Sequence, residues 1–271
     1  MPSYAVVGAS RGLGYGLLKQ LSADPDNVVF GVVRGVEAFR EKISKDVPSR
    51  KNIHAVYGDL ADLASLRAAA DAVSAVTGGS LDVLIANAAF IAADFDVIVK
   101  PGQDWDIFDK TTLDSFKINA LGNIHLMSVF TPLIQKGHLK KIVAISSGMG
   151  DINFTVEANV RFQAPYSISK AALNMAIAKF HVQYRKEGIL FMGISPGVVD
   201  TGVYDHFDVT DPHVQAGSQE MMTTMKNYAP HWEGPISPEE SASKVLEVVD
   251  NATIEANGGL MVSHLGTKRW L

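Results

Sequence analysis

The strongest constraint on the fold is a regular alternation of short β-rich runs with longer amphipathic segments. Strands that alternate with helices in this rhythm are joined by right-handed crossovers, which place the strands in one parallel sheet. Strands are predicted at residues 4–7, 28–33, 53–57, 81–86, 141–146, 189–194 and 259–263, and helices at 15–22, 36–47, 62–76, 112–135, 166–187 and 238–251. We therefore expect an α/β fold, a doubly wound seven-stranded parallel sheet with helices on both faces.

The composition narrows the class of protein. A chain of 271 residues, 47% of them hydrophobic, can bury one large core, and no linker or repeat divides it, so residues 1–271 are expected to form a single domain. The net charge of −5 comes without any Lys/Arg-rich block, which argues against binding to nucleic acid or to an anionic membrane surface. The apolar runs are too short for a membrane span, and the ordered pattern begins too early for a signal peptide.

Cysteine is absent, which excludes disulfides, thiolate catalysis and zinc–thiolate sites. The eight histidines show no ligand spacing, so no metal site is expected. A chain without cysteine is compatible with a reducing compartment, and we expect a cytoplasmic location.

A glycine-rich turn separates the first predicted strand from the first predicted helix. The pattern is Gly8-x-x-x-Gly12-x-Gly14, whose glycines allow a tight turn and a close approach of the backbone to a diphosphate. The amides at the start of the following helix add partial positive charge. This context favours a dinucleotide site, although a glycine-rich turn by itself is a weak signal.

Two arginines indicate which dinucleotide is bound. Arg34 ends the second predicted strand, at the position that reads the adenosine ribose in dinucleotide folds, and Arg11 lies inside the glycine turn. A guanidinium matches the charge and planar geometry of a 2′-phosphate, so the pair favours NADP(H) over NAD(H). The alternative is that both arginines are solvated surface residues.

Two further groups follow strands at the same edge of the predicted sheet. Asp59 follows the third strand and could accept a hydrogen bond from the adenine amine, although it could equally be a turn or capping acid. The turn Asn87-Ala88-Ala89 follows the fourth strand, and its small residues leave room for the adenine-side ribose. Ligands in parallel sheets bind at these carboxyl ends of the strands.

Tyr166 and Lys170 form a candidate catalytic pair. Residues at i and i+4 share one face of a helix, so the phenol and the ammonium should lie side by side. The cation favours the phenolate and would lower the pKa of the tyrosine toward a useful range for proton transfer. A polar pair on the surface of an ordinary helix is the alternative.

Asn119 and Ser147 are candidate partners of this pair. Asn119 lies inside the predicted 112–135 helix, where asparagine is unfavourable, so it could hold a local distortion and bind a water or simply be exposed. Ser147 follows the fifth strand and should face the ligand crevice, as should its neighbour Ser146.

Three segments without a clear sheet role are expected to shape a substrate pocket. They are read as a loop at 90–110, an irregular segment at 148–164 and a flap with short helices at 202–238. In the last of these, Met221, Met222 and Met225 could line an apolar pocket or form the buried face of a short helix.

Together these residues resemble the short-chain dehydrogenase/reductase family over almost the whole chain. The match comprises, in family order, Gly8-x-x-x-Gly12-x-Gly14, Asp59, Asn87-Ala88, Asn119, Ser147, Tyr166-x-x-x-Lys170, Pro196-Gly197 and Thr201. The arginine pair resembles the NADPH-preferring branch. The C-terminal segment is similar to that of sniffer-like carbonyl reductases and of fungal natural-product ketoreductases. The resemblance implies a Rossmann fold and a small-molecule carbonyl substrate.

The resemblance also implies roles for individual residues. Tyr166 would protonate the nascent alkoxide, Lys170 would hold the nicotinamide ribose, Ser147 would bind the carbonyl oxygen and Asn119 would fix a water that relays protons to Lys170. Pro196-Gly197 and Thr201 would orient the carboxamide. The implied NADP(H)-binding residues are Gly8, Ser10, Arg11, Gly12, Leu13, Gly14, Arg34, Asp59, Leu60, Asn87, Ala88, Tyr166, Lys170, Pro196, Gly197, Val199 and Thr201.

The sequence departs from the family pattern at a few positions. Val7 stands where the family usually has threonine, Ala89 replaces a glycine, and the segment between Ser147 and Tyr166 is several residues longer than usual. The expected activity is NADPH-dependent reduction of a ketone, an aldehyde or an imine, by a monomer, dimer or tetramer. The alternatives are a non-redox cyclase or isomerase that uses NADP(H) structurally, and a sensor of NADP(H) without turnover.

Overall fold

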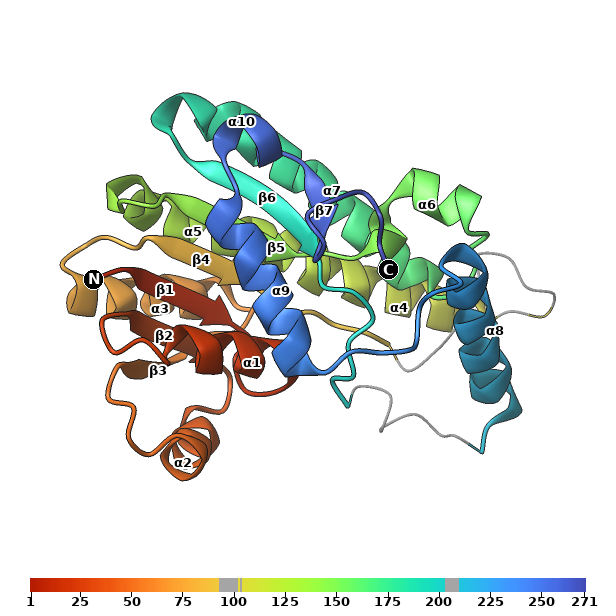
Figure 1. Cartoon of the computed structure of the whole chain (residues 1–271), viewed down its shortest axis with the longest axis horizontal. Coiled ribbons are helices and arrows are strands. Elements are labelled where there is room, and N and C mark those ends of the chain that lie inside the picture. Colours follow the sequence, from red (N-terminus) through yellow and green to blue (C-terminus); the bar gives the residue numbers. More distant parts are fainter. Residues whose placement is uncertain (93–101, 103, 203–209) are drawn as a thin grey trace.

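The computed structural model describes residues 1–92, 102, 104–202 and 210–271. Seven parallel strands form one sheet in the order β3-β2-β1-β4-β5-β6-β7, which confirms the predicted fold class (Figure 1). The strands are β1 (Ser3–Val7), β2 (Val28–Val33), β3 (Ile53–Tyr57), β4 (Val83–Ala86), β5 (Lys141–Ile145), β6 (Leu190–Ser195) and β7 (Met261–Ser263).

Helices cover both faces of this sheet (Figure 1). They are α1 (Gly12–Leu21), α2 (Val36–Asp46), α3 (Leu63–Thr77), α4 (Trp105–Phe116), α5 (Asn123–Lys136), α6 (Ile152–Glu157), α7 (Ala164–Tyr184), α8 (Pro212–Tyr228), α9 (Pro238–Asn251) and α10 (Ile254–Asn257). No helix within the described ranges is long and apolar enough to cross a membrane.

Side chains that alternate along each strand divide the core into two layers. In β1, Ala5 and Val7 pack with residues of α3, α5 and α7, whereas Tyr4 and Val6 pack with residues of α1, α2 and α9. This alternation follows from the period of two in a strand, and it explains why strands covered on both faces are continuously apolar.

The order of the strands reverses between β1 and β4. The chain runs from β1 outward to β2 and β3, then returns to add β4 on the other side of β1. Ala5 of β1 is therefore paired with Phe30 of β2 on one side and with Leu84 of β4 on the other. In open parallel sheets, ligands bind outside the carboxyl ends of the strands at such a reversal.

The region predicted as a loop at 90–110 and a helix at 112–135 is organised differently. Helix α4 already begins at Trp105, because the Asp104 side chain accepts hydrogen bonds from the amides of Asp106 and Ile107. The aspartates that suggested a loop thus include a helix cap. A π-helical turn at Lys117–Gly122 separates α4 from α5, so the expected distortion around Asn119 is confirmed. Residues 93–101 and 103 lie outside the described residues.

The two later segments are also more helical than predicted. The 148–164 segment contains a 3₁₀ turn at Gly148–Gly150 and helix α6, and the described part of the 202–238 segment contains the long helix α8 in place of short helices. These helices bury a third apolar cluster, which explains their stability despite weak local signals. Its buried members are Phe154, Val160, Phe162, Val214, Met221, Met225, Met261 and Trp270. Residues 203–209 lie outside the described ranges.

Candidate active site

A cavity of about 510 Å³ lies at the carboxyl ends of the strands. Its walls come from the turns after β1 to β6, from α6 and α8, and from the C-terminal segment. Its volume is in the range of small-molecule and cofactor sites. Lining residues at one end follow β1, β2 and β3, and those at the other end belong to α6, α8 and the C-terminal segment. Figure 1 shows where these elements lie. We call these the glycine-loop end and the apolar end.

The glycine turn forms a backbone cradle, and its residues Gly8, Ser10, Arg11, Gly12 and Leu13 line the cavity. Gly8 has a φ of +82°, and a Cβ there would come within 2.9 Å of Ala88. A Cβ on Gly14 would overlap the carbonyl oxygen of Gly8, and one on Gly12 would lie 3.0 Å from Thr201. A side chain at these positions would meet neighbouring protein atoms, so glycine is needed for the closely packed turn that precedes α1, as in a diphosphate site.

Asn87 ties the glycine turn to β4. Its Nδ2 donates to the carbonyl oxygens of Gly8, at 3.2 Å, and of Val7, at 3.4 Å. These bonds connect the two strands that the threonine usual at position 7 would have helped to connect. Although Val7 cannot make a side-chain hydrogen bond, Asn87 still links the glycine turn to β4.

The charged residues predicted to read the adenosine end do line the cavity. Arg11 and Arg34 stand on its wall together with Asp59 and Leu60. The Asp59 carboxylate accepts a hydrogen bond from the amide of Ala61 at 2.9 Å, which is the turn role considered as its alternative. Two guanidinium groups near the glycine cradle fit a dinucleotide that carries an extra phosphate.

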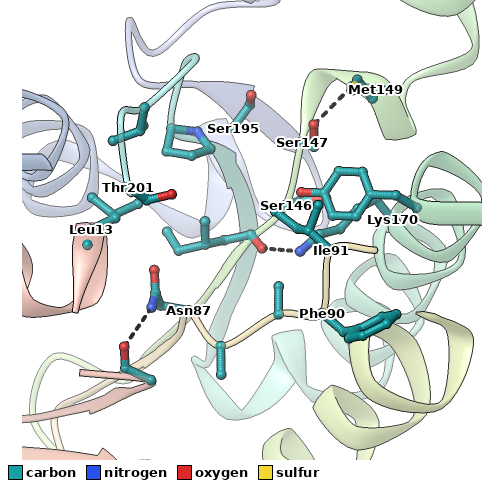
Figure 2. A pocket seen from close by; sticks show the side chains of 18 of the residues that line it. Leu13, Asn87, Phe90, Ile91, Ser146, Ser147, Met149, Lys170, Ser195 and Thr201 are labelled. Atoms are coloured by element: carbon teal, nitrogen blue, oxygen red, sulfur yellow. Dashed lines mark hydrogen bonds between the residues drawn. The ribbon is translucent and has the colours of Figure 1, made fainter. Parts of the chain in front are cut away.

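Tyr166 and Lys170 face each other on α7, as their spacing predicts. The Lys170 ammonium lies 5.6 Å from the centroid of the Tyr166 ring, and both residues line the cavity. Lys170 is only 1% exposed, and its Nζ donates to the carbonyl oxygen of Ile145 at 2.9 Å (Figure 2). Burial lowers the pKa of Lys170 from 10.5 to about 7, because a cation loses hydration there.

The two serines after β5 have different partners. The Ser146 hydroxyl donates to Oδ1 of Asn174 at 2.6 Å, and the residue is 2% exposed. The Ser147 hydroxyl instead accepts a bond from the amide of Met149 at 3.2 Å (Figure 2). A hydroxyl that accepts this bond keeps its proton available to a ligand, so the geometry favours Ser147 over Ser146.

Asn119 is fully buried behind the cavity and does not line it. Its Oδ1 accepts from the amide of Phe90 at 2.7 Å, and its Nδ2 donates to the carbonyl of Phe90 and to Oγ of Ser169. Ser169 Oγ in turn donates to the carbonyl of Tyr166 at 2.6 Å. The asparagine thus links the segment after β4 to the helix of the candidate catalytic pair.

The turn after β6 is held from two sides. Gly197 has a φ of +83°, and a Cβ there would lie 2.9 Å from the His264 ring. Ser241 Oγ donates to the carbonyl of Pro196 at 2.8 Å, which attaches the turn to α9. The predicted residues Pro196, Gly197, Val199 and Thr201 all line the cavity.

The structure brings most of the predicted site residues to one cavity. Gly14 and Asn119 are the exceptions, and both pack directly behind its wall. The apolar end includes residues from the 148–164 and 202–238 segments that the sequence predicts to shape a pocket, Met221 and Met225 among them, although most of its individual side chains are not predicted. Met149, Phe154 and Gln163 belong to the predicted 148–164 segment, whereas Trp270 lies outside every segment predicted to shape the pocket. Trp270 is far from these residues in the chain, and no local pattern in the sequence connects it with them.

Known proteins resemble the chain at the level of family and of fold. The model of the family described as short chain dehydrogenase matches residues 3–210. The chain is 43% identical over 274 residues to "Short chain dehydrogenase virK" of Hypocrea virens, and 42% identical over 277 residues to "Short-chain dehydrogenase/reductase AacuF" of Aspergillus aculeatus; both matches cover 100% of each chain.

Two solved structures share the fold over 98% of this chain and 98% of their own. Carbonyl reductase Sniffer of D. melanogaster superposes with a TM-score of 0.75 at 22% identity. The NADPH-bound carbonyl reductase from chicken fatty liver does so with a TM-score of 0.75 at 24% identity. At these identities the likeness shows the fold alone.

Proposed function

Because the chain belongs to the short-chain dehydrogenase/reductase family of oxidoreductases, we propose that it is an NADPH-dependent reductase of a ketone, an aldehyde or an imine. The observation that carries the proposal is the meeting of Ser147, Tyr166 and Lys170 on the wall of a cavity that also contains the glycine cradle. A proton donor, a cation and a hydroxyl donor beside a dinucleotide cradle are the groups that reduction of a carbonyl requires.

NADPH would occupy the glycine-loop end. The backbone from Gly8 to Gly12 would hold its diphosphate, and Arg11 and Arg34 would pair with the 2′-phosphate. The two arginines and the glycine cradle support this assignment. When bound, the nicotinamide would supply a hydride to the carbonyl carbon.

The side chains of α7 and of the turn after β5 would stabilise the negative charge that develops on the carbonyl oxygen and supply the proton that it takes up. Ser147 would donate a hydrogen bond to the carbonyl oxygen and stabilise its developing negative charge. Tyr166 would then transfer its phenolic proton to that oxygen, which completes the alcohol. Lys170 would hold the ribose and stabilise the resulting phenolate, since its amine lies over the same ring. Asn119 would act as a positioning residue through Phe90 and Ser169.

NADPH oxidation against a panel of ketones, aldehydes and cyclic imines tests the proposal. In Tyr166→Phe, we expect unchanged NADPH affinity and a loss of turnover on the order of 10²- to 10⁴-fold, the range for a general acid. Tyr184→Phe is the matched control, because Tyr184 lies on α7 among Phe180 and Phe191 and away from the cavity.

Two outcomes would contradict the proposal. Near-normal turnover in Tyr166→Phe would remove the tyrosine from the mechanism. Tight NADPH binding without oxidation across the whole panel would favour the non-redox or sensor alternatives. Products formed without consumption of cofactor would then identify a cyclase or an isomerase.

A further inference from the structure

Helix α7 is attached to the turn after β5 by two side chains that are one helical turn apart. Asn174 lies four residues after Lys170, so the two side chains share one face of the helix. Lys170 donates to the carbonyl oxygen of Ile145, the last residue of β5. Asn174 makes hydrogen bonds to Ser146 and to Gly150. The two contacts of Asn174 therefore lie on either side of the serine proposed to bind the carbonyl oxygen.

The two ends of the Asn174 amide have fixed roles. Its Nδ2 donates to the carbonyl oxygen of Gly150 at 3.1 Å, and a carbonyl oxygen can only accept. Oδ1 is therefore left to accept from the hydroxyl of Ser146, at 2.6 Å. Because Ser146 is 2% exposed, bulk water does not compete for this bond. Turning the amide over would disrupt the bond to Gly150, so the asparagine has one favoured orientation.

The residues that Asn174 contacts hold Ser147 between them. The carbonyl oxygen of Ser147 accepts from the amide of Gly150 at 2.9 Å, and its Oγ accepts from the amide of Met149 at 3.2 Å. Gly150 also packs directly on α7, since a Cβ there would lie 2.8 Å from the carbonyl carbon of Lys170. The Asn174 amide, the backbone of Gly150 and the backbone of Ser147 thus form a continuous series of hydrogen bonds.

We propose that Asn174 is a positioning residue that sets the place of the Ser147 hydroxyl relative to the proton donor Tyr166. This inference rests on the proposed function, in which Ser147 stabilises the charge that develops on the carbonyl oxygen. Ser147 follows β5 whereas Tyr166 belongs to α7, and Asn174 connects these two elements. A hydrogen-bond donor that is displaced stabilises the transition state less, even where the substrate still binds.

A double-mutant cycle between Asn174 and Ser147 tests this role. The probes are benzaldehyde, acetophenone and the cyclic imine pyrroline, and kcat and KM are measured separately with NADPH. In Ser147→Ala we expect kcat to fall by about 100-fold, the value of one donor to a developing oxyanion. In Asn174→Ala we expect a fall of about tenfold, with KM nearly unchanged. In the double variant, Asn174→Ala should cost nothing beyond the loss in Ser147→Ala, because the hydroxyl that it positions is gone.

Two further variants separate this role from a general effect on the fold. Asn251→Ala is the matched control, because the Asn251 amide donates to the carbonyl oxygen of Glu247 at 2.8 Å on α9, away from the residues that line the cavity. Its turnover should equal that of wild type. Asn174→Asp keeps an acceptor for Ser146, but its ionised form cannot donate to Gly150, so it should lose turnover as Asn174→Ala does. NADPH affinity should stay unchanged in all three variants.

Hydrogen exchange gives a second readout, which does not depend on activity. In Asn174→Ala, the amides of Met149 and Gly150 should exchange about tenfold faster than in wild type, because the turn that contains them has lost its hydrogen bond to α7. Exchange is followed by NMR without cofactor. Asn251→Ala should leave the exchange of both amides unchanged.

The outcomes distinguish this inference from the proposed function. Three results would overturn the positioning role alone: an unchanged kcat in Asn174→Ala, an equal loss in Asn251→Ala, or a tenfold loss that persists in the Ser147→Ala background. Wild-type turnover in Asn174→Asp, or exchange rates that do not differ between wild type and Asn174→Ala, would overturn it as well. No NADPH oxidation by wild type with any probe would overturn the reductase, and the positioning role with it.

Discussion

Backbone atoms shape one end of the cavity, whereas side chains shape the other. At the glycine-loop end, backbone contacts set the shape, since a Cβ on Gly8 or Gly14 would come within 3.0 Å of a neighbouring residue. At the apolar end, side chains from α6, α8 and the C-terminal segment make the wall. A backbone cradle can tolerate few changes, whereas a wall of methionine and aromatic side chains can be rebuilt residue by residue. The cofactor and the substrate should therefore respond to different mutations.

The largest expected effect comes from distorting the glycine turn from behind the cavity. In Gly14→Ala the new methyl group would overlap the carbonyl oxygen of Gly8 and crowd Nδ2 of Asn87, and neither can move without disturbing β1 or β4. We expect NADPH affinity to fall by about 100-fold or more, since this is more than the loss of one hydrogen bond. Fluorescence titration with NADPH measures it.

Gly35→Ala is the control for this prediction. Gly35 follows the second strand near Arg34, has a φ of −107°, and has no atom within 4 Å of its Cβ position. Its substitution should leave NADPH affinity close to wild type. Equal losses of NADPH affinity in Gly14→Ala and Gly35→Ala would show that the close packing around Gly14 does not matter for cofactor binding.

A smaller effect should follow from changing charge at the same end without changing its shape. In Arg34→Asp, a guanidinium that would pair with the 2′-phosphate becomes a carboxylate that repels it and accepts from a ribose hydroxyl. We expect the NADPH-to-NADH ratio of kcat/KM to fall by about 10- to 100-fold, the value of one or two charge-assisted hydrogen bonds. An unchanged ratio would leave the choice of cofactor to Arg11 and other groups.

At the apolar end, a substitution of Trp270 should affect substrate binding and stability but not NADPH binding. Its indole is 4% exposed, meets the Phe154 ring edge-on at 6.3 Å between centroids, and lies where a Cβ on Gly148 would come within 2.9 Å. Trp270→Ala should lower the free energy of unfolding by about 3 kcal/mol. It should also raise the KM for a ketone by about tenfold, while NADPH affinity stays unchanged.

The control is a tryptophan outside the cavity. Trp105 on α4 is 54% exposed, so Trp105→Ala should cost less stability and leave KM near the wild-type value. Thermal unfolding and steady-state kinetics measure both quantities. A parallel loss of NADPH affinity in Trp270→Ala would contradict the independence of the two ends.

The same difference explains what the sequence could predict. The glycine turn, the Tyr166–Lys170 pair and the distortion at Asn119 depend on neighbours in the chain, so local spacing was sufficient for them. The sequence places Asp104 in a loop, whereas the structure shows that its side chain caps α4, because an aspartate before a helix and an aspartate in a turn look alike in sequence. Trp270 has no local signal, since Phe154 and Gly148 lie far from it in the sequence and meet it only in the folded protein.

The smallest predicted effect concerns Lys170, which lies where the two ends meet. Burial lowers the pKa of Lys170 to about 7 in the folded protein, whereas the unfolded chain keeps the proton up to the ordinary value of 10.5. The unfolded state therefore binds more protons between about pH 7 and 10.5, and stability should rise with pH across that window. Lys170→Met has no buried charged amine and therefore lacks the free-energy cost of burying it. Without cofactor, its melting temperature should exceed that of wild type by a few °C at pH 6, and the difference should shrink toward pH 10. Lys179→Met, on the exposed face of the same helix, should show a gap that is flat with pH. A flat gap for Lys170→Met as well would mean that the folded protein keeps this amine charged at no cost. The cation beside Tyr166 would then be present before any ligand binds.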